Sequence, residues 1–278
     1  MEESFPFKYS LLEYLFTLVG LLLFLLDIAL DIWTVVSFYQ HGDYVYMAVM
    51  IFLLLGSSVL LQVFSWLWYS DSLETMEETK LETKLEEFAN RHKLIKPLHF
   101  LQFGLYLRYA GVIEISTTRF LQKTNSFTEG VAVYLNHDLQ MLRLFETFSE
   151  SAPQLILIMC SILQREELEL ITGLKFLSSA AAIAFTVALY HRSMRSFLQE
   201  KLKMSWNSTG IYFLWNLLLI IPRVTALALF CSVLPCYIIA HFLSLWMLLV
   251  LGVWSQKTDH MESPGWEWLF RATVGLIW

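Results

Sequence analysis

The sequence predicts an all-α fold: a polytopic helical membrane protein with about six full spans, a re-entrant segment and a truncated seventh span. Of its 278 residues, 56% are hydrophobic and only 16% are charged, whereas a soluble domain carries roughly a quarter charged residues. Several apolar runs reach the roughly 20 residues that a helix needs to cross a bilayer. This composition excludes a soluble enzyme, a disordered chain and a coiled coil.

Residues 1–69 are predicted to form the first two spans. One apolar run extends from Leu11 to Phe38 and ends at a turn over residues 40–43, and the second extends from Tyr44 to Tyr69. Residues 70–96 then carry seven acidic and five basic side chains. Such a stretch is typical of a solvated loop, with local helix supported by Glu–Lys pairs.

Residues 97–130 are predicted to hold a re-entrant or interfacial segment followed by a polar connector. The apolar run from Pro97 to Ile115 is short and contains Arg108. A run of this length with an arginine inside it does not favour a full crossing. Residues 116–130 are polar and lead to the next run.

Residues 131–278 are predicted to hold the remaining spans. The apolar runs cover 131–163, 170–190, 210–232 and 237–254, and a last run begins near Trp266. This last run ends after two or three turns, too short to cross about 30 Å of hydrocarbon. We therefore expect the chain to be truncated at its C-terminus.

The distribution of Lys and Arg predicts a cytoplasmic N-terminus. The stretch Ser70–Lys96 has five basic residues and the loop expected at His191–Met204 has four, whereas the turns at 39–43 and 234–236 have none and the loop 164–169 has one. Loops rich in Lys and Arg stay in the cytoplasm. The sequon Asn207-Ser208-Thr209 then lies on the cytosolic side, where it is not glycosylated.

Ionisable residues inside predicted spans are the candidate functional residues, because burying a charge in hydrocarbon is unfavourable. Asp27 and Asp31 share one face of the first span, and four residues form a polar stripe within an arc of about 140° on one helix. Pro153 is expected to interrupt and kink that helix. The stripe and the two isolated arginines are Asp138, Arg143, Glu146, Glu150, Arg108 and Arg223.

Two interpretations of these charges remain open. They could pair with one another to specify helix packing, or they could line a polar route through the hydrocarbon. A number of charges spread over several spans is typical of the second role. The candidate pairs are Arg143 with Glu146, and Arg108 or Arg223 with Asp27 or Asp31.

Other chemistry has little support in the sequence. There is no GxxxxGK[ST], HExxH or GxSxG motif, so nucleotide-driven pumping and the common hydrolytic mechanisms are not indicated. The three cysteines and the histidines lack metal-ligand spacing. We expect no enzyme activity, no cofactor, no metal and no nucleic-acid partner.

Several motifs resemble the XK-related family, most closely its branch of apoptotic phospholipid scramblases. The similarity covers nearly the whole chain. The motifs are FLLD at 24–27 with DIW at 31–33, VFSWLW at 63–68, MLRLFETF at 141–148 with APQL at 152–155, and IYFLWN at 211–216 with PRV at 222–224.

The resemblance implies ATP-independent, bidirectional movement of phospholipids that exposes phosphatidylserine on dying cells at the plasma membrane. It also implies eight spans with two half-penetrating segments, a single-span immunoglobulin-like partner, and a caspase site in a C-terminal tail beyond this chain. Tyr46 falls where a close relative has a tryptophan near the outer end of the path. The implied buried charges are Asp27, Asp31, Arg108, Asp138, Glu146, Arg192 and Arg223.

One departure from the family pattern concerns Arg192. Relatives carry an acidic residue before the Tyr-His-Arg motif, whereas this chain has Leu189 there, so the partner of Arg192 is open. The alternatives to a scramblase are a non-scrambling accessory or structural subunit of the same family, or a small-solute transporter with a midplane site.

Overall fold

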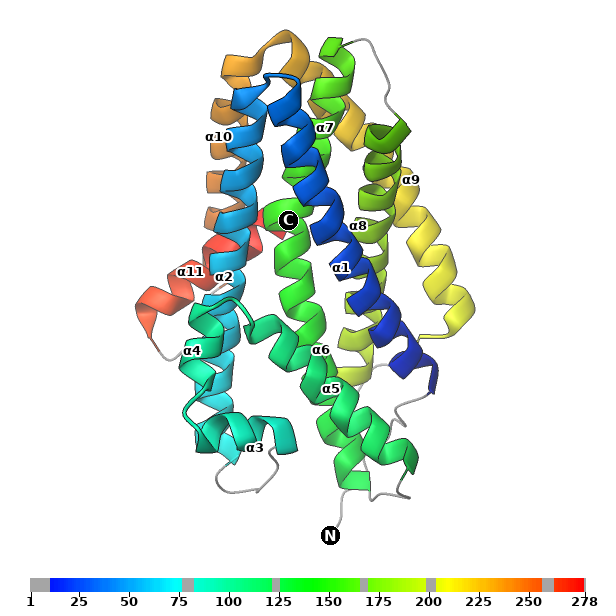
Figure 1. Ribbon diagram of the computed structural model, residues 1–278, viewed down its shortest axis with the longest axis vertical. Helices are drawn as coiled ribbons and strands as arrows, with labels where there is room; N and C mark the ends of the chain where they lie inside the picture. Colours follow the sequence, from blue (N-terminus) through cyan, green and yellow to red (C-terminus); the bar gives the residue numbers. More distant parts are fainter. Residues whose placement is uncertain are drawn as a thin grey trace. The chain divides into compact units, whose positions relative to one another are not determined.

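The computed structural model describes residues 11–76, 83–121, 126–165, 170–198, 204–256 and 263–277. Within these ranges the chain is helical and contains no strand, which confirms the all-α prediction (Figure 1). The helices are α1 (Leu11–Gln40), α2 (Tyr44–Met76), α3 (Lys84–Arg91), α4 (Ile95–Phe100), α5 (Gly104–Leu121), α6 (Ser126–Glu146), the π-helical turn η1 (Thr147–Ser151), α7 (Ala152–Arg165), α8 (Leu170–Phe197), α9 (Trp206–Val233), α10 (Pro235–Ser255) and α11 (Pro264–Ile277).

Four helices in the described ranges are long and apolar enough to span a membrane, namely the segments 11–40, 44–70, 173–197 and 206–233. Helix α10 contributes a shorter apolar segment, 240–255. The remaining expected span, residues 131–163, lies in α6, η1 and α7, and its charged stripe lowers its apolar character. The structure therefore supports a multi-pass membrane protein, while the count of six spans and a re-entrant segment stays a prediction.

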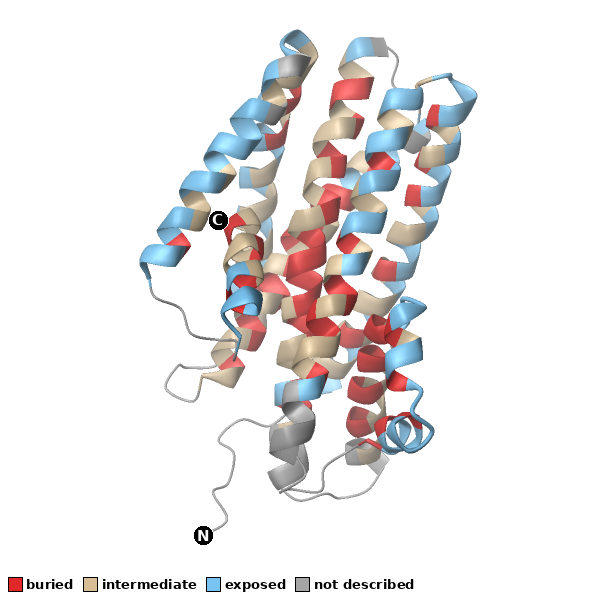
Figure 2. Ribbon diagram, turned by 90° about the vertical axis from the view of Figure 1, so that its left-hand side faces the viewer, coloured by how far each residue is buried: buried red, intermediate tan, exposed pale blue. Residues whose placement is uncertain are grey.

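The spanning helices expose much of their apolar surface. Only 17% of the most apolar window of α1 and 11% of that of α9 is buried within the protein. Figure 2 shows exposed positions along most of the helices. Apolar helices with so little protein cover need a lipid environment, because exposed apolar patches of this extent are rare on soluble proteins.

The chain divides into two compact units. Unit 1 comprises residues 1–33, 58–143 and 185–213, and unit 2 comprises residues 34–57, 144–184 and 214–278. Five helices, α1, α2, α6, α8 and α9, contribute residues to both units. In unit 2, a buried cluster of Leu155, Ala180, Ile183 and Val224 joins α7, α8 and α9.

Two chain reversals are closed by the same kind of helix cap, and the sequence predicted only the first of them. After α1, Gly42 has φ +77°, and the N–H of Asp43 donates to the carbonyl of Phe38 at 2.9 Å. After α4, Gln102 has φ +68°, and the N–H of Phe103 donates to the carbonyl of Leu98 at 2.8 Å. Both are Schellman caps. The second reverses the chain, so that α5 runs back from the end of α4 (Figure 1).

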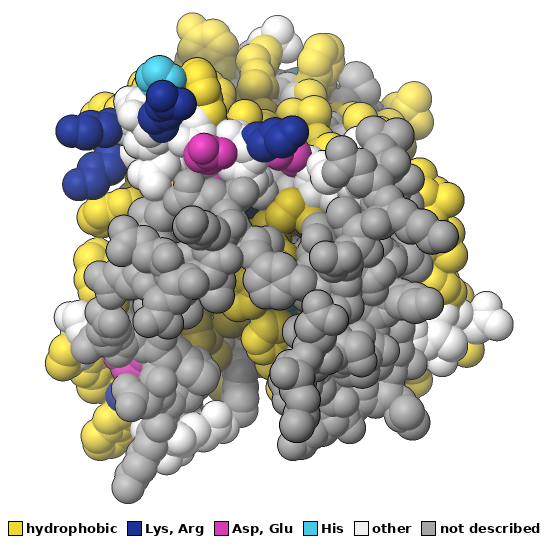
Figure 3. Space-filling model, turned by 90° about the horizontal axis from the view of Figure 1, so that it is seen from below, with side chains coloured by type: hydrophobic (Ala, Val, Ile, Leu, Met, Phe, Trp, Pro, Cys, Tyr) yellow, Lys and Arg dark blue, Asp and Glu magenta, His cyan; other side chains and the backbone are white. Residues whose placement is uncertain are grey.

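Helix α3 begins inside the charged stretch that was expected to be a loop with helical content. Thr83 and Glu86 form a capping box, which satisfies two backbone N–H groups. The carboxylate of Glu114 on α5 accepts from the two N–H groups between them, those of Lys84 at 2.8 Å and Leu85 at 3.1 Å. Figure 3 views the molecule from the side on which α3 lies in Figure 1, and Lys and Arg side chains gather there.

In unit 2, helix α11 packs along α10. The indole N–H of Trp246 donates to the carbonyl of Ala272 at 2.9 Å. A Cβ atom added to Gly275 would lie 2.8 Å from a methyl carbon of Val250, so glycine permits the close approach. The run predicted to be a truncated seventh span is thus a 14-residue helix held against its neighbour.

Candidate functional site: buried charges in apolar helices

Arg108 on α5 is the centre of a buried polar network in unit 1. Its Nη1 lies 3.1 Å from Oδ2 of Asp138 on α6. Its Nε and Nη2 donate to the hydroxyl and the backbone carbonyl of Ser65 on α2, at 3.1 and 2.9 Å. Asp27 and Asp31 were candidate partners of Arg108 under the packing interpretation, and the structure pairs Arg108 with Asp138 instead. Asp138 lies on the helix that faces Arg108, which spacing along the sequence cannot reveal.

The network continues from Ser65 to His99 on α4. Nδ1 of His99 lies 2.8 Å from the carbonyl of Ile95 and therefore carries the proton. Nε2 is then the acceptor for the Ser65 hydroxyl at 3.0 Å. His99 lies outside the four candidate spans, and burial, reinforced by the charge of Arg108, lowers its pKa. A neutral imidazole thus completes the chain of hydrogen bonds.

Gln62 on α2 fixes the turn between α4 and α5. Its Nε2 donates to the carbonyl of Gln102 at 3.2 Å, and its Oε1 accepts from the N–H of Gly104 at 3.0 Å. Gln62, Ser65 and the bonding role of His99 were not predicted from the sequence. A signal was present, because Ser58, Gln62 and Ser65 have the i, i+4, i+7 spacing of one helix face.

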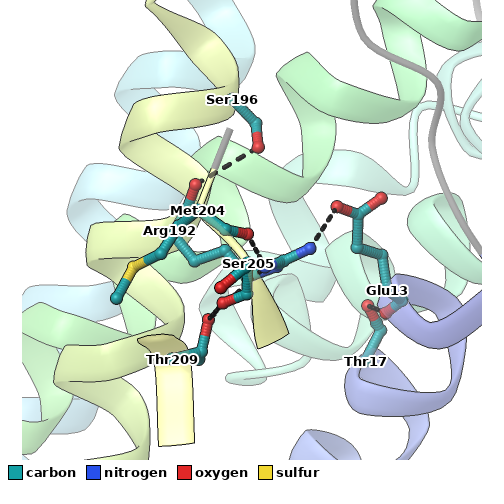
Figure 4. A network of polar contacts seen from close by, with 7 residues as sticks. All are labelled: Glu13, Thr17, Arg192, Ser196, Met204, Ser205 and Thr209. Atoms are coloured by element: carbon teal, nitrogen blue, oxygen red, sulfur yellow. Dashed lines mark hydrogen bonds and ion pairs between the residues drawn. The ribbon is translucent and has the colours of Figure 1, made fainter. Parts of the chain in front are cut away.

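Arg192 on α8 is the centre of a second cluster in unit 1 (Figure 4). Its Nη2 lies 3.3 Å from Oε1 of Glu13 on α1. Its Nη1 donates to the carbonyl of Met204 and to Oγ1 of Thr209. Glu13 is therefore the acidic partner that the sequence left open. No sequence signal could have named it, because 179 positions separate the two residues.

The guanidinium of Arg192 also stacks on an aromatic ring. It lies 3.6 Å from the ring centre of Trp206, and Trp206 stacks on Phe16 with ring centres 4.5 Å apart. A desolvated cation over an indole is strongly favourable. Arg192 was expected in a loop beginning at His191, but α8 continues to Phe197, so this boundary was wrong.

The structure places the remaining charges of unit 1 on α1 and α6. Asp31 is 1% exposed, and Asp27 is half-buried one turn earlier. The guanidinium of Arg143 lies 4.7 Å from the ring centre of Phe24, so the stripe of α6 faces α1 at this level. The contact with Phe24 places the charge of Arg143 against the first predicted span.

In unit 2, the charged stripe continues through η1. Glu146 and Glu150 are both buried. The N–H of Ala152 bonds to the carbonyl of Thr147, five residues back, immediately before Pro153. Such π turns often occur at functional sites. Lys175 on α8 is 1% exposed and was missed, although a lysine inside an apolar run is itself a signal.

Arg223 does not join the buried charges. Its side chain is exposed on α9, so the expectation that it is buried is wrong for the part of the chain that the structure describes. Its position within an apolar run did not reveal whether the protein covers that side of α9. Which side receives protein cover is decided by the neighbouring helices.

Tyr46, the residue implied at the outer end of the path, joins two helices of unit 2. Its hydroxyl donates to Oε1 of Gln164 at 2.6 Å and lies 3.5 Å from Sγ of Cys160. Its ring packs on Phe38 with centres 5.6 Å apart. Tyr46 thus holds the start of α2 against α7.

No group of three or more metal-binding side chains occurs among the described residues. In unit 1, Arg108 bonds to Asp138 and Ser65, and Ser65 bonds to His99. Their arrangement can hold a phosphate at an arginine or an ammonium at a carboxylate.

Comparison with known proteins identifies the family. The model of the family described as "XK-related protein" matches residues 15–278. The chain belongs to the XK-related protein family. XK-related protein 8 of Tetraodon nigroviridis is 43% identical over 280 residues, which cover all of this chain and 68% of that protein. XK-related protein 8 of Pan troglodytes is 38% identical over 93% of this chain and 64% of its own length.

A relative with another name is more distant. XK-related protein 9 of Tetraodon nigroviridis is 27% identical over 97% of this chain and 72% of that protein. The chain thus spans about two thirds of the length of these relatives. The resemblance to the XK-related family that was based on sequence motifs is confirmed.

Proposed function

We propose that this XK-related protein is an ATP-independent phospholipid scramblase of the plasma membrane that exposes phosphatidylserine during apoptosis. The observation that carries the proposal is the set of buried charges on helices otherwise fit for a membrane. Burying ionisable groups in a membrane protein is unfavourable and usually marks a pathway for polar solutes. The resemblance to the apoptotic scramblase branch supplies the solute, which is a phospholipid headgroup.

The charges suit a zwitterionic or anionic headgroup because both signs are present. Arg108 and Arg143 can receive a phosphate, and Asp138 and Glu146 can receive an ammonium group. A headgroup that exchanges contacts with such a series loses less solvation than it would in hydrocarbon. Acyl chains would remain in the bilayer beside the apolar helix surfaces. No nucleotide is required, because lipids cross passively in both directions and their net movement is down the concentration gradient.

We further propose a cytoplasmic N-terminus and a re-entrant α4–α5 hairpin. The charge distribution supports the orientation. The turn at Leu101–Phe103 supports the re-entrant path, because its backbone groups bond to α4 and to Gln62 rather than to lipid. A single-span immunoglobulin-like partner and a caspase site beyond this chain are proposed from the resemblance alone.

One observation favours a second candidate, a non-scrambling accessory or structural subunit. Arg108 is bonded to Asp138 and Ser65, and Arg192 is bonded to Glu13 and stacked on Trp206. Buried pairs of this kind can serve packing alone. The two candidates differ in what happens when a whole pair is replaced.

The experiment is reconstitution into liposomes that contain fluorescent phosphatidylserine or phosphatidylcholine, without nucleotide. The scramblase is expected to bring inner-leaflet lipid within reach of an external quencher in minutes. The double variant Arg108→Leu with Asp138→Leu removes both charges and leaves no unpaired charge behind. It should fold and reach the cell surface yet scramble at least about tenfold more slowly, a change of about 1.4 kcal/mol in barrier height.

The matched control is the pair Glu267→Leu with Arg271→Leu on α11. This pair also has an N–O distance of 3.1 Å, and its side chains are 8% and 13% exposed, but it lies outside the stripe. Scrambling should continue at nearly the native rate in this control. Normal scrambling by the Arg108–Asp138 double variant would favour the packing role, and a folded native protein that scrambles no lipid would support the accessory subunit.

A further inference from the structure

A cavity of about 720 Å³ lies between α2 and α4, outside the buried charges. Val59, Val63 and Trp66 of α2 form one wall, and Phe100 of α4 contributes to the other. Its volume falls in the range of about 300–1,000 Å³ that is typical of ligand sites. Side chains of this kind favour an apolar, flexible occupant.

The polar residues of the lining differ in what remains available to a ligand. Gln62 and His99 are buried, and their side chains bond within the α2–α4–α5 network. Lys96 also lines the cavity and is exposed. A cation at the rim of an apolar cavity matches a ligand with an anionic head and an apolar tail.

The surroundings of the cavity match a membrane surface. Lys84, Arg91 and Lys93 are exposed on α3 and the turn after it, beside the exposed acid Glu87. Exposed apolar side chains lie among these charges, including Phe88 at 55% and Leu94 at 39%. Mixed basic and apolar side chains are typical of segments that lie in the interface of an anionic leaflet.

We infer that this cavity binds one anionic phospholipid, with an acyl chain against Val59, Val63 and Trp66 and the headgroup phosphate at Lys96. The site goes beyond the proposed lipid route, because its residues carry none of the charges assigned to that route. It rests on the proposed orientation only in that the cytoplasmic leaflet supplies the anionic lipid. A lipid bound here would cover the apolar wall of α2 and hold α4 to the membrane.

The test uses the full chain in phosphatidylcholine nanodiscs with a trace of photoactivatable phosphatidylserine that carries the reactive group in one acyl chain. Labelled residues are located by mass spectrometry. Labelling is expected on α2 and α4 around the cavity, and photoactivatable phosphatidylcholine should label this site less. Lys96→Gln should lower phosphatidylserine labelling about fivefold, whereas Lys84→Gln, an exposed lysine outside the cavity, should change it less.

A second variant tests the cavity itself. Val59→Trp fills the cavity from an exposed position and should abolish labelling, whereas Val49→Trp, on the same helix but outside the cavity, should not. Unfolding temperatures confirm that each variant is folded. Equal labelling by both lipids, unchanged labelling of Val59→Trp, or full competition by water-soluble glycerophosphoserine would overturn the inference. Labelling in a chain that does not scramble would support this site and count against the proposed function alone.

Discussion

Arg108 and Arg192 are both buried arginines in unit 1, but the protein stabilises them in different ways. Arg108 relies on hydrogen bonds to Asp138 and to Ser65. Arg192 has a longer ion pair with Glu13 and adds a carbonyl, a hydroxyl and the face of Trp206. Arg192 therefore spreads its stabilisation over more groups, and loss of one partner should matter less there than at Arg108.

The largest expected difference concerns the two acidic partners. Asp138→Leu leaves the buried charge of Arg108 without its counterion and should lower the free energy of unfolding by about 3–5 kcal/mol. The loss for Glu13→Leu should be about 1–2 kcal/mol smaller than that for Asp138→Leu, because Trp206 and Met204 still contact Arg192. Equilibrium unfolding in mixed detergent micelles measures both. Adding Arg108→Leu to Asp138→Leu should restore most of the loss, and equal losses for the two single variants would refute the comparison.

The aromatic support of Arg192 should have the next largest effect. Trp206→Leu removes the ring under the guanidinium and the stack on Phe16, and about 3 kcal/mol of stability should be lost with them. Trp206→Tyr should retain part of it. The same unfolding assay applies. A loss below about 0.5 kcal/mol for Trp206→Leu would show that the ion pair alone holds Arg192.

The hydrogen bonds that Ser65 makes with Arg108 and His99 should contribute somewhat less to stability than Trp206 does. Ser65→Ala removes the acceptor of Nε of Arg108 and the donor to Nε2 of His99, and should lower stability by about 2 kcal/mol, as expected for unsatisfied buried polar groups. Ser58→Ala, at the more exposed end of the same polar face of α2, should lower it by about 1 kcal/mol or less. If the two alanine variants were equally stable, the hydrogen bonds from Ser65 to His99 and Arg108 would contribute little.

At Asn207, which lies beside the Arg192 cluster, we expect no glycosylation and therefore no effect of substitution on gel mobility. Asn207 lies in the first turn of α9, and Oγ1 of Thr209 donates to the carbonyl of Ser205 at 2.9 Å. With this end of α9 in the cytoplasm, the chain expressed in cells should show no glycan-dependent mobility. Asn207→Gln is the control. A mobility shift that this substitution removes would place the Arg192 cluster on the outer side and invert the proposed orientation.

The two arginines also differ in how much of their surroundings the sequence predicted. Arg108 was recognised because a charge stands out within an apolar run, whereas its partner Asp138 was not among the candidates. Arg192 entered only through the family resemblance, and its partner was left open. The spacing of Ser58, Gln62 and Ser65 indicates a polar face on α2, but this face was not among the predictions. A charge that breaks a pattern is visible in the sequence, but the group that meets it across two helices is not.

By itself, the sequence determined the helical membrane class, four of the long apolar helices, the turn after α1, and the charged stripe of α6. These follow from local rules, namely length, apolar content, periodicity and the conformations allowed at a chain reversal. Tertiary structure alone decided that Arg108 pairs with Asp138, that Glu13 meets Arg192, and that Arg223 is exposed. The physical reason is that helix periodicity fixes which side chains share a face, whereas packing fixes what each face meets.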